Sequence, residues 1–173
     1  VSCYTSPYSP AGLSCTSKTQ TSVSLSWTKP STGSVTGYRV YKKDITAGAS
    51  SYTYVNYTTS TSYNVSVTAG HKYSFKVTSY LDTTSNESTP GATIECYAKA
   101  PTCSFSVSPD TSAPNTTQKL SWTWPESGRS DMWLYIYKGT SSTFTNSTLV
   151  ASKSKDDGTS LSYSSLSANT NYY

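Results

Sequence analysis

Strict alternation of apolar and polar residues is the feature that most constrains how this chain folds. The runs VSLSW at 23–27 and YSFKV at 73–77 place a large apolar side chain at every second position. Successive side chains of a strand point to opposite faces, so this pattern predicts strands with one buried face. Turn-forming clusters separate such runs, among them TKPSTGSVTG at 28–37 and SKDDGTS at 154–160. No stretch shows convincing helical periodicity. The chain is therefore predicted to be all-β, with a sandwich architecture.

An internal repeat then divides the chain in two. LSWTKP at 25–30 returns as LSWTWP at 120–125, an offset of 122 − 27 = 95 residues between the tryptophans. Two further landmarks follow in the same order in both halves: YRVYK and LYIYK, then VTAGHKY and LSANTNY. We therefore predict an amino-terminal strand-like segment and linker at 1–10, a first domain at 11–100 and a second, incomplete domain at 101–173.

The quoted landmarks resemble fibronectin type III domains. The resemblance rests on PAGLSCTSKTQTSVSLSWTKP, GYRVYKK and VTAGHKYSFKV, and it covers residues 10–100 in full and 101–173 in part. It implies that Trp27 is buried against either Tyr38 or Tyr41. It also implies a tyrosine corner, in which an apolar residue six positions before a tyrosine marks the turn between strands E and F. These core and corner residues are Trp27, Val67 and Tyr73 in the first repeat, and Trp122, Leu166 and Tyr172 in the second.

The same resemblance implies seven strands per domain, and the second repeat is short of two. SFKVTSYL and GATIECYAKA match strands F and G of the first repeat, while the second repeat has no sequence after its corner. The segment VSCY at 1–4 resembles IECY at 94–97, the end of the first strand G. Either the sequence is a window on a longer array, or copies share strands head to tail and grow a filament. The first explanation is simpler, because residues 1–10 supply one strand and two are missing.

Four cysteines without paired C-x-x-C spacing favour two disulfides over a zinc site. They are Cys3, Cys15, Cys96 and Cys103. The favoured pairing, Cys3–Cys15 with Cys96–Cys103, places each disulfide at an interdomain hinge, where the end of a strand G meets the start of the next strand A. The alternative joins Cys15 to Cys96 within one domain and leaves Cys103 for the Cys3 of another molecule.

Five N-x-[ST] sequons accompany this even cysteine count and favour an extracellular glycoprotein. The candidate acceptors are Asn56, Asn64, Asn86, Asn115 and Asn146. Alternation turns Asn64 toward solvent. A net charge of +4 with no basic run longer than two residues argues against nucleic-acid binding. No segment approaches the length of about 18 apolar residues that a membrane span requires.

The sequence offers little catalytic chemistry. Its single histidine, His71, lies in a turn and is expected to be solvated, and no glycine-rich phosphate loop is present. We expect no enzymatic activity, no cofactor and no metal. One patch that the fold does not require joins Trp124, Trp133 and the loop residue Arg129. This patch is expected to cap the core, with an interface or a sugar contact as the functional alternatives.

These observations predict a secreted or surface-displayed, non-catalytic structural or adhesive glycoprotein built from tandem repeats. The expected partners are neighbouring copies or adjacent domains of the same protein and covalent N-glycans. The more specific form of this prediction is that the chain is a filament subunit. The alternative is a spacer or carbohydrate-contacting module of a secreted glycan-degrading enzyme.

Overall fold

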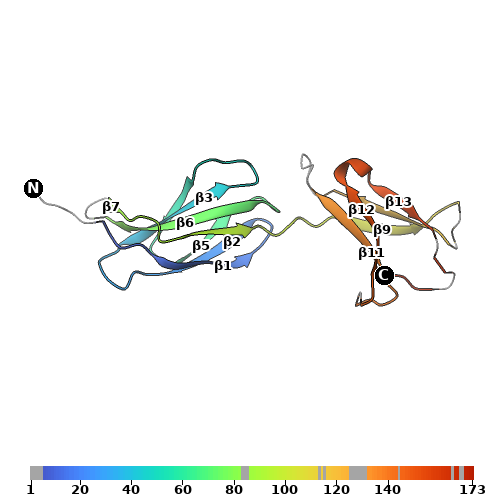
Figure 1. Cartoon of the computed structure of the whole chain (residues 1–173), viewed down its shortest axis with the longest axis horizontal. Coiled ribbons are helices and arrows are strands. Elements are labelled where there is room, and N and C mark those ends of the chain that lie inside the picture. Colours follow the sequence, from blue (N-terminus) through green and yellow to red (C-terminus); the bar gives the residue numbers. More distant parts are fainter. Residues whose placement is uncertain are drawn as a thin grey trace, which may run out of the picture. The chain divides into compact units, whose positions relative to one another are not determined.

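A computed structural model shows that the chain divides into two compact units, unit 1 (Val1–Pro101) and unit 2 (Thr102–Tyr173) (Figure 1). The structure describes residues 6–82, 86–112, 114, 116–124, 132–143, 145–164, 166–167 and 170–173. Within these residues the regular structure is β-strand, apart from one 3-10 turn at Lys155–Asp157. The all-β prediction is confirmed.

Unit 1 consists of two antiparallel sheets. The first has the order β1-β2-β5, and in the second β4, β3 and β6 follow one another while β7 and β8 both pair with β6. The strands are β1 (Ala11–Lys18), β2 (Ser22–Thr28), β3 (Gly37–Asp44), β4 (Thr53–Thr58), β5 (Ser62–Ser66), β6 (Lys72–Leu81), β7 (Asn86–Glu87) and β8 (Thr93–Tyr97). Because the apolar residues of β2, β3 and β6 that face the opposite sheet are buried, the two sheets enclose one core.

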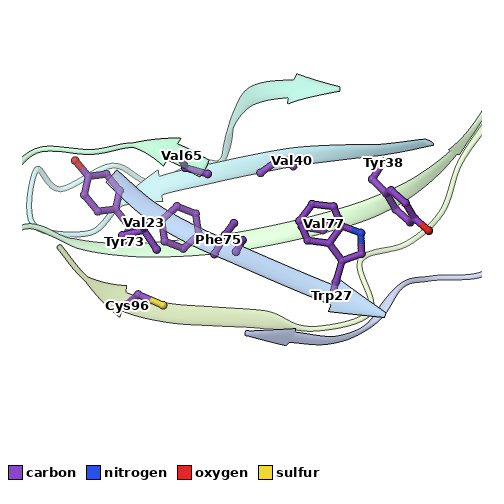
Figure 2. Close-up of a cluster of buried hydrophobic side chains, with 10 residues drawn as sticks. Val23, Trp27, Tyr38, Val40, Val65, Tyr73, Phe75, Val77 and Cys96 are labelled. Carbon is purple, nitrogen blue, oxygen red and sulfur yellow. The ribbon is translucent and has the colours of Figure 1, made fainter. Parts of the chain in front are cut away.

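The core of unit 1 is aromatic at both ends (Figure 2). Trp27 meets Tyr38 edge to face, with the ring centroids 5.4 Å apart. Tyr73 stacks on Phe75 at the other end of the cluster, at 5.9 Å. Of the two partners expected for Trp27, Tyr38 is therefore the one in the core, whereas Tyr41 lies on the outer face of the sheet. Aliphatic side chains from β2, β3, β5 and β6 fill the space between these aromatic pairs.

A disulfide joins Cys15 to Cys96 across the edge of the sandwich, with the Cα atoms 6.7 Å apart. The favoured hinge pairing was wrong. It assumed that Cys15 opens its strand, but β1 begins at Ala11 and carries Cys15 toward the pole where β8 also ends. The chain segments after both strands meet there, since the Lys99 amide donates to the Thr19 carbonyl at 2.9 Å. Cys103 forms no disulfide within the described residues, and Cys3 lies outside them.

Unit 2 repeats this plan with fewer strands. One sheet has the order β13-β10-β9 and the other is the pair β11-β12. The strands are β9 (Ser104–Pro109), β10 (Gln118–Thr123), β11 (Trp133–Lys138), β12 (Thr148–Ser154) and β13 (Ser160–Tyr163). The second sheet of unit 2 is a true pair, because β12 pairs along the length of β11.

The correspondence between the units extends to irregularities. Pairing of β3 with β4 shifts register between Val40 and Tyr41, and pairing of β11 with β12 shifts between Ile136 and Tyr137, the equivalent residues. Among the described residues of unit 2, no strand corresponds to β6 or β8, and only Trp122 and Ile136 of the apolar side chains are buried. The described core of unit 2 is therefore open where β6 and β8 close unit 1.

Candidate interaction surface

The outer face of the five-stranded sheet of unit 1 carries an aromatic and basic surface. On β3, Tyr38 and Val40 point into the core, so the alternating positions Arg39, Tyr41 and Lys43 point outward. Lys76 lies beside Tyr41 on the neighbouring strand, in register with it. We call the set Tyr41, Lys43, Tyr52, Tyr54 and Lys76 the Tyr–Lys face.

Close contacts order the side chains of the Tyr–Lys face. The Lys76 ammonium lies 4.6 Å from the ring centre of Tyr41 and 5.0 Å from that of Tyr52. Lys43 approaches the Tyr52 ring at 5.1 Å. Tyr54 packs edge to face on Tyr41 at 5.7 Å and is still 52% exposed. These cation–π and aromatic contacts hold the rings in fixed positions beside two basic groups.

Two polar residues of β6 are buried beneath this outer layer. Ser74 is 4% exposed, and its hydroxyl hydrogen-bonds the Tyr52 hydroxyl at 2.7 Å. Thr78 is 2% exposed and donates to Glu87 Oε1 at 2.5 Å. An outward-facing sheet position is ordinarily solvated, so the burial of both hydroxyls shows that the overlying side chains form an ordered layer.

Glu87 is the acceptor at the centre of a second cluster, next to the Tyr–Lys face. Arg39 forms an ion pair with its Oε2 at 3.0 Å, and Tyr41 donates to its Oε1 at 2.6 Å. Burial acts to raise the pKa of Glu87, but the bonds from Thr78, Tyr41 and Arg39 outweigh it and hold that pKa below its ordinary value. The pKa of Tyr41 rises to about 12, through burial and then its bond to Glu87.

Sequence reasoning missed this surface because it treated the tyrosines as strand-forming residues. The available signal was in YRVYKK at 38–43, where each outward-facing residue between the core positions is basic or aromatic. Glu87 gave no such signal, since β7, which positions it, is only two residues long.

The two tryptophans of the predicted patch differ in exposure. Trp124 is half-buried and its indole N–H donates to the Gly158 carbonyl at 3.4 Å, whereas Trp133 begins β11 and is 56% exposed. Trp133 takes the position of Gly37, over which the Tyr57 ring packs in unit 1 so closely that a Cβ would overlap it. Arg129 lies outside the described residues. An interface or sugar contact at this patch stays a prediction.

The candidate glycosylation sites differ in accessibility. Asn64 is exposed on β5, Asn56 is exposed on β4 at the edge of its sheet, and Asn146 is exposed in a turn with φ of 64°. Asn86 lies in β7 and is half-buried. Asn115 lies outside the described residues. Three of the five acceptors therefore present their side chains to solvent.

His71 has a structural partner. Its Nδ1 lies 2.9 Å from Asp44 Oδ2, and its ring stacks on Tyr73 at 6.1 Å. The expectation of a solvated turn residue was wrong, because the pair ties the β5–β6 turn to the end of β3. Among the described residues, no group of three or more His, Cys, Asp or Glu side chains could hold a metal ion.

Both units contain the same corner. The Thr68 amide donates to the Tyr73 hydroxyl at 2.9 Å, and the Ser167 amide donates to the Tyr172 hydroxyl at 3.0 Å. Together with the two facing sheets and the Trp27–Tyr38 core, this motif defines an immunoglobulin-like β-sandwich. The model for the fibronectin type III domain matches residues 8–94, half of the chain, and the chain belongs to this family.

A solved structure of two such domains shares this fold. The two-domain fibronectin type III segment from chicken tenascin is 21% identical, with a TM-score of 0.62, and the match covers 94% of this chain and 86% of that one. Domains A168–A170 of titin are 25% identical, covering 54% of this chain and 32% of theirs, with a TM-score of 0.49. The domain of human fibronectin type III domain containing protein 3 is also 25% identical, covering 57% and 92%, with a TM-score of 0.49.

No curated protein matches the chain. Domains of this family are generally structural or adhesion modules without catalytic activity, and they are commonly extracellular. None of the helical structure in the described residues has the length and apolar character of a membrane span.

Proposed function

We propose that this chain is a non-catalytic structural or adhesive module of an extracellular glycoprotein, built from tandem fibronectin type III repeats. The observation that carries the proposal is the Cys15–Cys96 disulfide. Disulfides persist in oxidising compartments and are rare in the cytosol, so this bond favours a secretory route. The exposed side chains of Asn56, Asn64 and Asn146 support the same route, because a secreted chain would present these sequons to solvent.

The test is secreted expression followed by mass measurement before and after enzymatic removal of N-glycans. We expect a mass loss, and we expect it to decrease when Asn64→Gln removes the acceptor on β5. Gln20→Ala, a substitution outside every sequon, is the control and should leave the glycan mass intact. An unmodified chain with free thiols at Cys15 and Cys96 would contradict the extracellular assignment.

Strand sharing between copies is a second candidate, favoured by the open core of unit 2. An open groove of about 100 Å³ is lined by apolar side chains that include Val107, Leu120 and Ile136. Val107 is 56% exposed and Phe105 is 48% exposed, although both belong to β9. An added strand would cover this apolar surface.

The donor in this candidate is the segment at 1–10 of another copy, of which residues 1–5 lie outside the described part of the chain. Sedimentation at increasing concentration tests it. We expect oligomers that grow without closing, and their loss when residues 1–7 are deleted. A monomer at every concentration, or oligomers indifferent to the deletion, would refute strand sharing and leave the structural-module proposal intact.

A further inference from the structure

Unit 1 holds the entire net charge of the chain. It contains eight Lys or Arg against four Asp or Glu, which gives +4, while unit 2 contains five of each. Two of the four carboxylates in unit 1 are in ion pairs, Glu87 with Arg39 and Glu95 with Lys72, and Asp44 is hydrogen-bonded to the His71 ring. The basic charge that remains on unit 1 is therefore largely uncompensated.

Part of that uncompensated charge is ordered on the Tyr–Lys face. Among the described residues, no carboxylate lies within ion-pair distance of Lys43 or Lys76. Both ammonium groups are held beside the Tyr52 ring, at 5.1 and 5.0 Å from its centre. These two positive charges share the face with the exposed ring of Tyr54, which packs on Tyr41. Together they form a surface complementary to carboxylates near an apolar or aromatic group.

We propose that the Tyr–Lys face binds an acidic peptide segment of a partner protein. Carboxylates of the segment pair with Lys43 and Lys76, and an apolar or aromatic side chain packs on Tyr54. The tyrosines suit this role because they supply large, rigid contact area at low entropic cost, and Tyr is enriched in protein interfaces. This inference does not depend on glycosylation or strand sharing.

The carboxylates near the Tyr–Lys face are already engaged, and this favours a peptide over a polysaccharide as the ligand. Recognition of sugar hydroxyls uses available acceptors, yet Glu87 is engaged by Arg39, Tyr41 and Thr78, and Glu95 is engaged by Lys72. The backbone of β3 is paired on both sides, with β4 and β6. Binding on this face therefore relies on side-chain charge and aromatic packing.

The experiment uses the full chain and a short fluorescent peptide of alternating glutamate and tyrosine, followed by fluorescence anisotropy. We expect binding that weakens with added salt, and a loss of affinity of about tenfold or more in the Lys43→Glu/Lys76→Glu variant. Lys18→Glu/Lys29→Glu is the matched control. It makes the same change in net charge at exposed positions at the end of β1 and just after β2, in the other sheet, and should retain binding.

Equal losses in the two double variants would show a nonspecific charge effect and overturn the proposal, as would an absence of binding. Tyr54→Ser gives an independent reading if the charge reversal unfolds unit 1. Because Tyr54 is half exposed, this variant should fold and still lose affinity. Binding of dextran sulfate through Lys43 and Lys76, without binding of the peptide, would replace the peptide by a polysaccharide and refute the proposal as stated.

Discussion

The backbone N–H of Ser167 donates a hydrogen bond to the hydroxyl of Tyr172 at 3.0 Å, and this bond closes the tyrosine corner of unit 2. Beyond the corner, Gly139 and Tyr173 exchange two backbone hydrogen bonds, at 2.9 and 3.2 Å. In unit 1, Lys43 and Ser74 occupy the equivalent register. The corner, whose own hydrogen bond joins residues five apart in sequence, therefore places Tyr173 in the register that β6 uses in unit 1.

The hydrogen bond to the corner tyrosine should contribute measurably to the stability of unit 1. Tyr73 is 2% exposed, and Tyr73→Phe leaves the Thr68 amide without its acceptor at a part-buried site, so we expect a loss of about 1 kcal/mol in the free energy of unfolding. Urea denaturation measures it. Tyr54→Phe removes a hydroxyl from a ring that is 52% exposed and should change stability little. Equal effects of the two substitutions would contradict a special role for the corner.

Trp27 should be the most costly single truncation in the core of unit 1. It is 5% exposed and contacts Tyr38, so Trp27→Ala opens a large cavity and should cost about 3–5 kcal/mol. Within the described part of the chain the buried indole N–H has no hydrogen-bond partner, and Trp27→Phe should therefore cost less than the loss of volume alone suggests. Thermal unfolding of both variants tests this order. An unchanged transition in Trp27→Ala would contradict the assignment of the core.

Reduction of the disulfide should destabilise unit 1 alone. Cys15 and Cys96 are 81 residues apart, and cross-linking a loop of that length stabilises the folded state by about 4.5 kcal/mol in the chain-entropy model. Calorimetry with and without a reductant should show a lower melting temperature for unit 1 in the reduced chain, and Cys15→Ala/Cys96→Ala should match it. Cys103→Ser is the control and should leave the transition unchanged, because Cys103 is outside this bond.

Acid should weaken unit 1 through Glu87. The pKa of Glu87 is lower in the folded chain than its ordinary value of 4.5, because bonds from Thr78, Tyr41 and Arg39 outweigh the effect of burial. A carboxyl group with a depressed folded-state pKa stabilises the fold above its unfolded pKa and loses that contribution as the pH falls through the folded value. Stability should therefore decrease as the pH falls below 4.5.

Melting temperatures across this pH range test the role of Glu87. Glu87→Gln should reduce the fall in melting temperature at acid pH, because the glutamine cannot ionise. Tyr41→Phe should move the fall in melting temperature to higher pH, because it removes one donor that lowers the pKa of Glu87. If Glu87→Gln and the unaltered chain lost the same stability at acid pH, the pH dependence would belong to other groups.

The alternation of β2 and β6 predicted both strands and their buried faces, because the period of a strand is a local property. The repeated motifs likewise predicted two related units, and the family resemblance predicted both tyrosine corners. Trp27 and Tyr73 were predicted from the family resemblance and are buried as expected. The disulfide was mispredicted, because the position of Cys15 along the sandwich depends on where β1 begins, which its sequence does not mark.

The sequence alone thus determined the elements of this protein: strands, turns, the order of motifs and the two-unit plan. Tertiary structure decided which residues from distant strands meet. It selected Tyr38 rather than Tyr41 for the core and joined Cys15 to Cys96. It also brought Glu87 to Arg39 across 48 residues and gathered tyrosines and lysines into the Tyr–Lys face. The physical reason is that alternation specifies the face on which a side chain lies, whereas its neighbours on that face come from other strands whose register is set by pairing.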